Sequence, residues 1–191
     1  MNKTIIFLFA LILTASFVLA EQQATDTGTG QGLGQSLEGQ VQAGNYISNQ
    51  GEEMQIRAED GIKIKVEDSE AHSLLNITSE KIQEKTHLNV QLSNGRNAEI
   101  KIMPNTASET ALARLRLKVC NESNNCTIQL KEVGNGNETR LAYEIQIERH
   151  SRILAIFEKK MQVGVDLDAE TGAVLGEHKP WWAFIATEPA E

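Results

Sequence analysis

The two cysteines of this chain, Cys120 and Cys126, are separated by five residues, and this spacing bears directly on their chemistry. It suits a small disulfide ring that holds one local turn, whereas paired zinc ligands usually stand closer together, in C-x-x-C. The four histidines stand singly along the sequence, so no second pair of metal ligands accompanies the thiols. We therefore predict a Cys120–Cys126 disulfide, and neither a metal nor a cofactor.

Four carboxylates near the C-terminus have the spacing of a calcium-binding loop. With Asp166 at position 1, Asp168, Glu170 and Glu177 stand at positions 3, 5 and 12, and hard oxygen ligands at such positions bind Ca²⁺. Position 6 lacks the glycine of such loops, and the apolar residues alternate as in a strand that points both aspartates outward. We favour a solvated hairpin over a calcium site.

Patterns typical of catalysis are missing from the sequence. It contains no G-x-S-x-G nucleophile elbow, and its Gly-rich stretch follows no strand and opens no helix, so it does not predict a phosphate-binding loop. His150 stands between Arg149 and Arg152, where a solvated basic turn is a simpler interpretation than a proton shuttle. We predict that the chain is not an enzyme and has no catalytic residue.

Three aromatic residues near the C-terminus, Trp181, Trp182 and Phe184, are the candidate interaction residues. Exposed tryptophan is a preferred anchor of protein interfaces. The simpler interpretation, which we favour, is a last core strand with Trp182 and Phe184 on one face. A membrane interface is a third alternative, which the nearby Glu188 and Glu191 disfavour.

Four Asn-x-Ser/Thr sequons are candidate glycosylation sites. They begin at Asn76, Asn121, Asn125 and Asn137. The last three cluster around the cysteines and the Gly-Asn turn that follows. The sequons indicate exposed turns whether or not they carry glycans.

The N-terminus predicts export. Lys3 precedes an apolar run, Ile5 to Ala20, that ends in residues suited to signal peptidase. These sixteen residues fall short of the ~20 that a spanning helix needs, so we favour a signal peptide over residues 1–20 to an uncleaved anchor. We expect a secreted or cell-surface protein with no stable membrane span after cleavage.

The charge balance limits the classes of partner. The chain has 18 basic and 26 acidic residues, which gives a formal net charge of -8. Proteins that bind nucleic acid through counterion release, or that bind anionic membranes, need a positive surface instead. We therefore expect a protein partner, no nucleic acid and no anionic membrane.

The sequence pattern divides the exported part into three regions. Residues 21–45 are rich in Gly and Gln and poor in large apolar residues, as in a flexible linker. Residues 46–103 alternate apolar and polar side chains, as in β hairpins. Residues 104–187 combine one helical segment with further strands. Residues 68–85 show no clear pattern.

Two hairpins in the second region share one turn design. A three-residue loop at residues 59–61, with left-handed Gly61, puts Ala58 opposite Ile62 and Ile56 opposite Ile64. The same design at Ser93–Gly95 aligns two further pairs. These pairs are Val90 with Ala98 and Leu88 with Ile100.

The third region begins with a helix signal. Thr106 and Glu109 have the spacing of a capping box, and a helix of about 13 residues is expected to follow. Its apolar face comprises Ala107, Ala111, Leu112, Leu115 and Val119. We expect the disulfide loop to tie its end to a strand, Thr127–Val133.

Two long strands follow, joined near Arg149–Arg152, and the chain then turns at residues 168–172 into a final strand. The end of this region resembles the PepSY domain family. The sequence V-D-L-D-A-E-T-G-A-V, residues 165–174, is similar to the closing V-D-x-x-T-G-x-V/I strand of that family, and A-Y-E-I-Q-I, residues 142–147, to the strand before it.

The resemblance covers roughly residues 105–176. It implies an exported, non-catalytic module that restrains peptidases outside the cell, acting in trans because no protease domain follows. The disulfide loop, the long connection over residues 149–161 and the aromatic tail depart from the family's pattern.

We conclude from the sequence that the fold class is α+β, with mainly antiparallel β hairpins and one principal helix packed on a sheet. The expected function is a non-catalytic exported binding module that modulates a peptidase or another extracellular or envelope protein. The alternative is a structural, glycosylated cell-surface component without a specific ligand.

Overall fold

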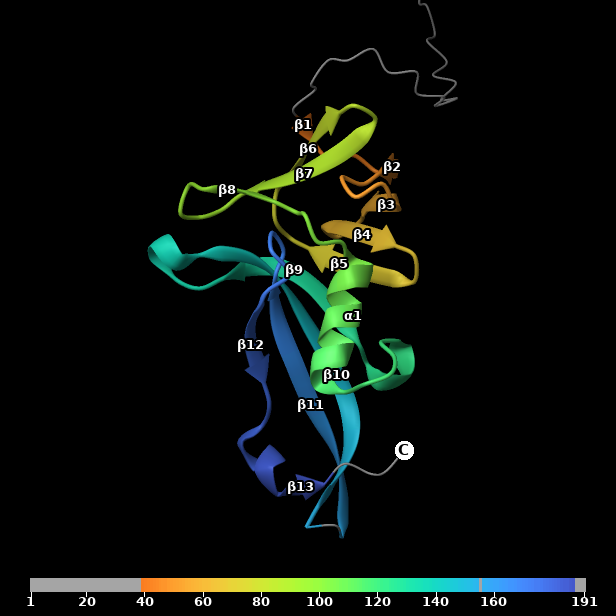
Figure 1. The fold of residues 1–191 in the computed structure, drawn as a ribbon, viewed down its shortest axis with the longest axis vertical. Coiled ribbons are helices and arrows are strands. Elements are labelled where there is room, and N and C mark those ends of the chain that lie inside the picture. Colours follow the sequence, from red (N-terminus) through yellow and green to blue (C-terminus); the bar gives the residue numbers. More distant parts are fainter. Residues whose placement is uncertain (1–38, 155, 188–191) are drawn as a thin grey trace, which may run out of the picture. The chain divides into compact units, whose positions relative to one another are not determined.

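The structure is a computed structural model that describes residues 39–154 and 156–187 (Figure 1). The predicted signal peptide and residues 21–38 of the predicted linker lie outside the described residues. The described part is mostly β-sheet with the α-helix α1 (Pro104–Leu115), which confirms the α+β class. No helix within it has both the length and the apolar composition to cross a membrane.

The larger sheet has the strand order β12-β11-β10-β9-β5-β4-β3-β2. In chain order these strands are β2 (Gly44–Ile47), β3 (Glu53–Ala58), β4 (Ile62–Val66), β5 (Ser69–Ser73), β9 (Thr127–Val133), β10 (Arg140–Ile153), β11 (Phe157–Asp168) and β12 (Val174–His178). A short strand, β13 (Ala186–Thr187), also pairs with β10. Neighbouring strands of the larger sheet are antiparallel, except β5 and β9. The parallel pairing of β5 with β9 joins the hairpin region to the C-terminal region.

The smaller sheet has the order β1-β6-β7-β8. These strands are β1 (Gly39–Gln40), β6 (Ile77–Ile82), β7 (Lys85–Gln91) and β8 (Asn97–Glu99). The prediction of a flexible linker as far as residue 45 is therefore wrong at its end: β1 pairs with β6, and Val41 is buried. Two elements, β5 and β6, occupy residues 68–85, which the sequence pattern left unassigned.

The predicted register of both hairpins is confirmed. Ala58 lies opposite Ile62, and Val90 lies opposite Ala98. Gly61 has a φ of 113°, and a Cβ there would lie only 2.6 Å from the carbonyl oxygen of Ser73. Glycine is therefore required at this turn both by its backbone angle and by the close approach of β5.

The helix begins and ends earlier than predicted, and the capping box is wrong. The N-cap is Met103, whose thioether makes no cap hydrogen bond, and Pro104 opens the helix at its first position. The helix ends where Arg116 takes a left-handed conformation, and the Leu117 amide bonds the Leu112 carbonyl in a Schellman pattern. Val119 therefore lies outside the helix and is exposed.

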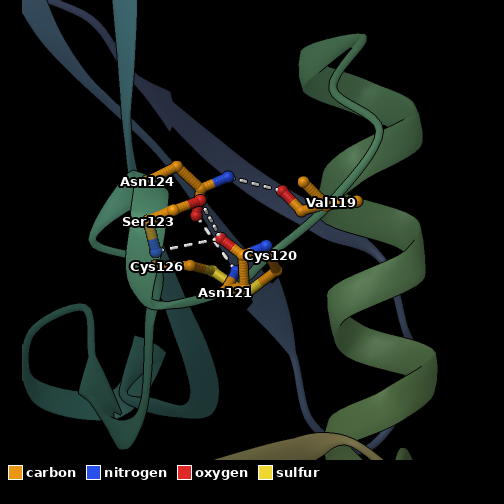
Figure 2. Close-up of a disulfide and its surroundings, with 6 residues drawn as sticks. All are labelled: Val119, Cys120, Asn121, Ser123, Asn124 and Cys126. Carbon is orange, nitrogen blue, oxygen red and sulfur yellow. Dashed lines mark hydrogen bonds between the residues drawn. A yellow bond between two sulfur atoms is a disulfide. The ribbon is translucent and has the colours of Figure 1, made fainter.

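The predicted disulfide is present between Cys120 and Cys126, whose Cα atoms are 5.1 Å apart. Figure 2 shows the loop that the disulfide closes. In it the side-chain amide of Asn124 donates to the Val119 carbonyl at 2.7 Å. The backbone of Cys126 donates to the Asn121 carbonyl. As predicted, the loop links the segment after α1 to β9 at Thr127.

One apolar core continues through both sheets and α1. Alternate residues of β10 and β11 contribute to it, together with Ala107, Ala111 and Leu115 of the helix. The hydroxyl of the fully buried Tyr143 donates to the Ile102 carbonyl at 2.9 Å, and burial raises the pKa of this phenol. The opposite face of β10 carries the polar residues Glu144, Gln146 and Glu148.

Candidate functional site

The aromatic segment is not the core strand that we favoured from the sequence. Residues Trp181–Ile185 form a 3₁₀ helix, η3, followed by β13. A 3₁₀ helix has three residues per turn, so Trp181 and Phe184 share one side, and each is 80% exposed. Trp182 turns toward the core instead, with the Lys159 ammonium 5.0 Å from its ring centroid.

The long hairpin turns later than predicted. Arg149–Arg152 belong to β10, which pairs with β11 as far as Ile153 opposite Phe157, so the predicted junction and basic turn are wrong. Arg152 and Glu158, which lie opposite each other in this pairing, also form an exposed ion pair. His150 is an exposed strand residue.

The turn and the aromatic segment are bonded to each other. The Leu154 amide donates to the Ile185 carbonyl at 3.2 Å, and Ile153 pairs with Ala186 of β13. In Figure 1, β13 lies beside the lower part of the β10–β11 hairpin. We call the exposed apolar residues of this end the apolar tip. They are Leu154, Ile156, Phe157, Trp181 and Phe184, with exposed fractions from 64% to 80%.

A pocket of about 440 Å³ opens along the β10–β12 edge of the sheet. Its lining includes Glu144 and Gln146 of β10, Gly164 of β11, His178 of β12, and Trp182. Gly164 leaves space at the base of the pocket, because a Cβ at this position would contact the Gln146 and His178 side chains. The pocket therefore combines polar side chains from three neighbouring strands with one aromatic wall.

The four carboxylates with the spacing of a calcium loop, the alternative that we disfavoured, each have separate partners in the described structure. Asp166 contacts the His178 ring, and Asp168 accepts the Glu170 and Thr171 amides of its own turn. Glu170 pairs with Arg96, and Glu177 pairs with Arg114 and Lys179. The favoured hairpin is present, but Asp166 and Asp168 are largely shielded from solvent, with side chains 14% and 3% exposed.

Two residues that line the pocket, Glu144 and His178, belong to a charged cluster with Asp166 and Lys131. Asp166 Oδ2 lies 2.7 Å from His178 Nε2, and Lys131 Nζ lies 2.8 Å from Glu144 Oε2. Burial alone would raise the pKa of the Glu144 carboxyl, but hydrogen bonds from Lys131 and Gln146 and the charges of Lys131 and His178 lower it below its usual value. Glu144 is therefore an anion at neutral pH.

Sequence reasoning missed Glu144 and His178, which are 34 residues apart. The only local signal was the alternation that turns Glu144 and Asp166 away from the core, because their contact depends on strand register. The predicted sequon asparagines Asn76, Asn121, Asn125 and Asn137 are all exposed.

The predicted site residues thus fall into separate groups. Trp181 and Phe184 join the apolar tip, Trp182 lines the pocket, and the cysteines and two sequons share the disulfide loop. Comparisons of this chain with protein-family models, curated proteins and solved structures found no match.

Proposed function

We propose that this chain is a non-catalytic, exported binding module that contacts another extracellular or envelope protein through the apolar tip. The observation that carries this proposal is the concentration of five large apolar side chains, each at least 64% exposed, at one end of the described fold. The Cys120–Cys126 disulfide is compatible with an extracellular location.

The tip has the composition of an interface anchor. Tryptophan and phenylalanine are enriched among interface residues, and burying one such side chain contributes roughly 2 kcal/mol or more. Trp181 and Phe184 are held on a short helix that is fixed by Trp182 packing and by β13, so little backbone ordering is needed on binding.

The partner that we propose is a peptidase, and the support is the resemblance to PepSY domains. The chain has a helix followed by β9, β10, β11 and β12 over the residues that carry this resemblance. The turn between β11 and β12 is capped by Asp168 within the V-D-x-x-T-G-like segment. The proposed action is stoichiometric restraint of the peptidase.

The experiment compares the secreted chain with a Trp181→Ala/Phe184→Ala variant. Both are crosslinked to the surface fraction of the organism that produces the chain, and captured proteins are identified by mass spectrometry. The top candidate is then purified and its affinity measured directly. We expect the double variant to bind at least 30-fold more weakly, the equivalent of about 2 kcal/mol.

Leu74→Ala is the matched control, since Leu74 is 81% exposed and lies after β5, in a different part of the fold. It should bind as the unaltered chain does. Equal affinity of all three chains for the purified partner would refute the tip as the contact surface. Inhibition of a captured peptidase at a one-to-one ratio would support the peptidase assignment, and unchanged turnover with the chain bound would contradict it.

A second candidate function, a glycosylated structural component of the cell surface, rests on the exposure of all four sequon asparagines. Mass spectrometry of the chain from its own organism tests it. Glycans at these positions and retention at the envelope would favour this role, whereas unmodified chain in the medium would exclude it.

A further inference from the structure

We propose that Glu144, Asp166 and His178 form a binding site for a divalent transition-metal ion of the Zn²⁺ type. One ligand atom from each residue lies within 4.8 Å of the other two. The site is separate from the apolar tip, and its test does not depend on the proposed function.

Strand register holds the three side chains together. Glu144 lies directly opposite Asp166, and Gly164, two residues before Asp166, lies opposite His178. Directly opposite residues of antiparallel strands point to the same face, so all three project away from the buried core. The ligands thus come from three paired strands, which fixes their positions more firmly than a loop does.

Two features of the cluster point to a bound cation. Like charges directly opposite each other on neighbouring strands are destabilising, and Glu144 faces Asp166 in this way, with Lys131 and His178 as the basic groups beside them. In addition, Asp166 Oδ1 is buried and has no hydrogen-bond partner among the described residues. A buried carboxylate oxygen without a partner is costly, and coordination to a cation would satisfy it.

The donor set selects the type of ion. One imidazole nitrogen with two carboxylate oxygens suits Zn²⁺ and similar ions, whereas Ca²⁺ takes six to eight oxygen ligands. Three protein ligands leave a fourth position for water or for a group of a partner. Tetrahedral Zn²⁺ ligands stand about 2.0 to 2.2 Å from the metal, so the ligand atoms lie roughly 3.4 Å from one another. The ligand atoms of this cluster lie within 4.8 Å of one another, which is close to that spacing.

Small movements are enough to admit the ion. The direct contact between His178 Nε2 and Asp166 Oδ2, 2.7 Å apart, would open so that the ion binds between the imidazole and the Asp166 carboxylate. The Lys131 ammonium would release Glu144, which its 40% exposed side chain permits. Gly164 leaves the space beside His178 open, since it has no side chain to fill it.

The test is calorimetric titration of Zn²⁺ into the secreted chain, prepared without a polyhistidine tag. We expect one saturable site per chain. His178→Ala and Glu144→Gln should each weaken binding at least about tenfold, because each removes one of three protein ligands. The near-isosteric Glu144→Gln keeps the test valid if His178→Ala fails to fold, and circular dichroism checks both.

The polar face of the same hairpin offers matched controls. Glu148 lies four residues after Glu144 on β10 and is likewise paired with a lysine, Lys160, while His150 is exposed on the same strand. Glu148→Gln and His150→Ala should bind Zn²⁺ as the unaltered chain does. Absence of saturable binding, or equal losses in the control variants, would overturn the proposal.

Trp182 gives a second readout, since it lines the same pocket. The paramagnetic ion Co²⁺ should quench its fluorescence in a Trp181→Phe background, and Glu144→Gln should abolish the saturable part of the quenching. Quenching that persists in Glu144→Gln would place the ion elsewhere and contradict the site.

Discussion

Asp168 is expected to stabilise the turn between β11 and β12 through its carboxylate. One oxygen, Oδ1, accepts the amides of Glu170 at 3.0 Å and of Thr171 at 2.9 Å, while Oδ2 lies 3.5 Å from the Arg140 guanidinium. The side chain is only 3% exposed. Asp168→Ala removes all of these contacts at once.

The expected loss follows from these contacts. A hydrogen bond to a charged group contributes about 1.5 to 3 kcal/mol, but water can replace part of this at Thr171, which is exposed. We therefore expect Asp168→Ala to lower the free energy of unfolding by about 2 to 3 kcal/mol. Asp168→Asn keeps an acceptor for the amides and loses the charge, so it should lose about half as much.

Urea unfolding followed by circular dichroism, with the disulfide intact, measures these differences. Glu170→Ala is the control in the same turn, since its pairing with Arg96 is a surface ion pair worth below about 1 kcal/mol. A loss below about 0.5 kcal/mol in Asp168→Ala would refute the argument. Equal losses in Asp168→Asn and Asp168→Ala would mean that the charge, and not the acceptor for the amides, stabilises the turn.

Two further predictions concern the disulfide and acid. Replacing both cysteines by serine should lower the free energy of unfolding by about 2 kcal/mol, because the closed ring is small, and urea unfolding with and without reductant checks this. Glu99 and Glu144 have folded pKa values that burial would raise but that hydrogen bonds from His87 and Lys131, respectively, lower. The stability that these two carboxylates contribute is therefore complete above their unfolded pKa of about 4.3, and it is lost as the pH falls through their lower folded pKa values. The urea concentration at the unfolding midpoint should accordingly decline below about pH 5. Glu144→Gln should reduce that decline, and an unchanged decline would contradict the assignment.

Local signals predicted the parts of this fold that neighbouring residues determine. The Gly61 turn gave the correct register because only one alignment places both apolar faces on the core. The C-x5-C spacing similarly predicted the disulfide. The helix start was misplaced because Thr106 and Glu109 satisfy a capping pattern, yet Pro104 already suits the first helical position.

The candidate sites depend on contacts that sequence patterns do not encode. The aromatic spacing was compatible with a core strand, whereas the segment forms a 3₁₀ helix between β12 and β13 with Trp181 and Phe184 exposed. The cluster of Glu144, Asp166 and His178 requires the register of three strands. The parallel pairing of β5 with β9 has no short-range signal, because a long segment separates the two strands.

That parallel pairing constrains the order in which the chain is able to fold as it is synthesised. Strand β5 is synthesised well before β9 and exposes an open edge during the interval. Contacts between residues distant in sequence form slowly, and unpaired edges promote aggregation. The yield of folded protein should consequently depend on how well the nascent chain protects β5 until β9 is made, a kinetic demand that the equilibrium stability of the folded chain does not report.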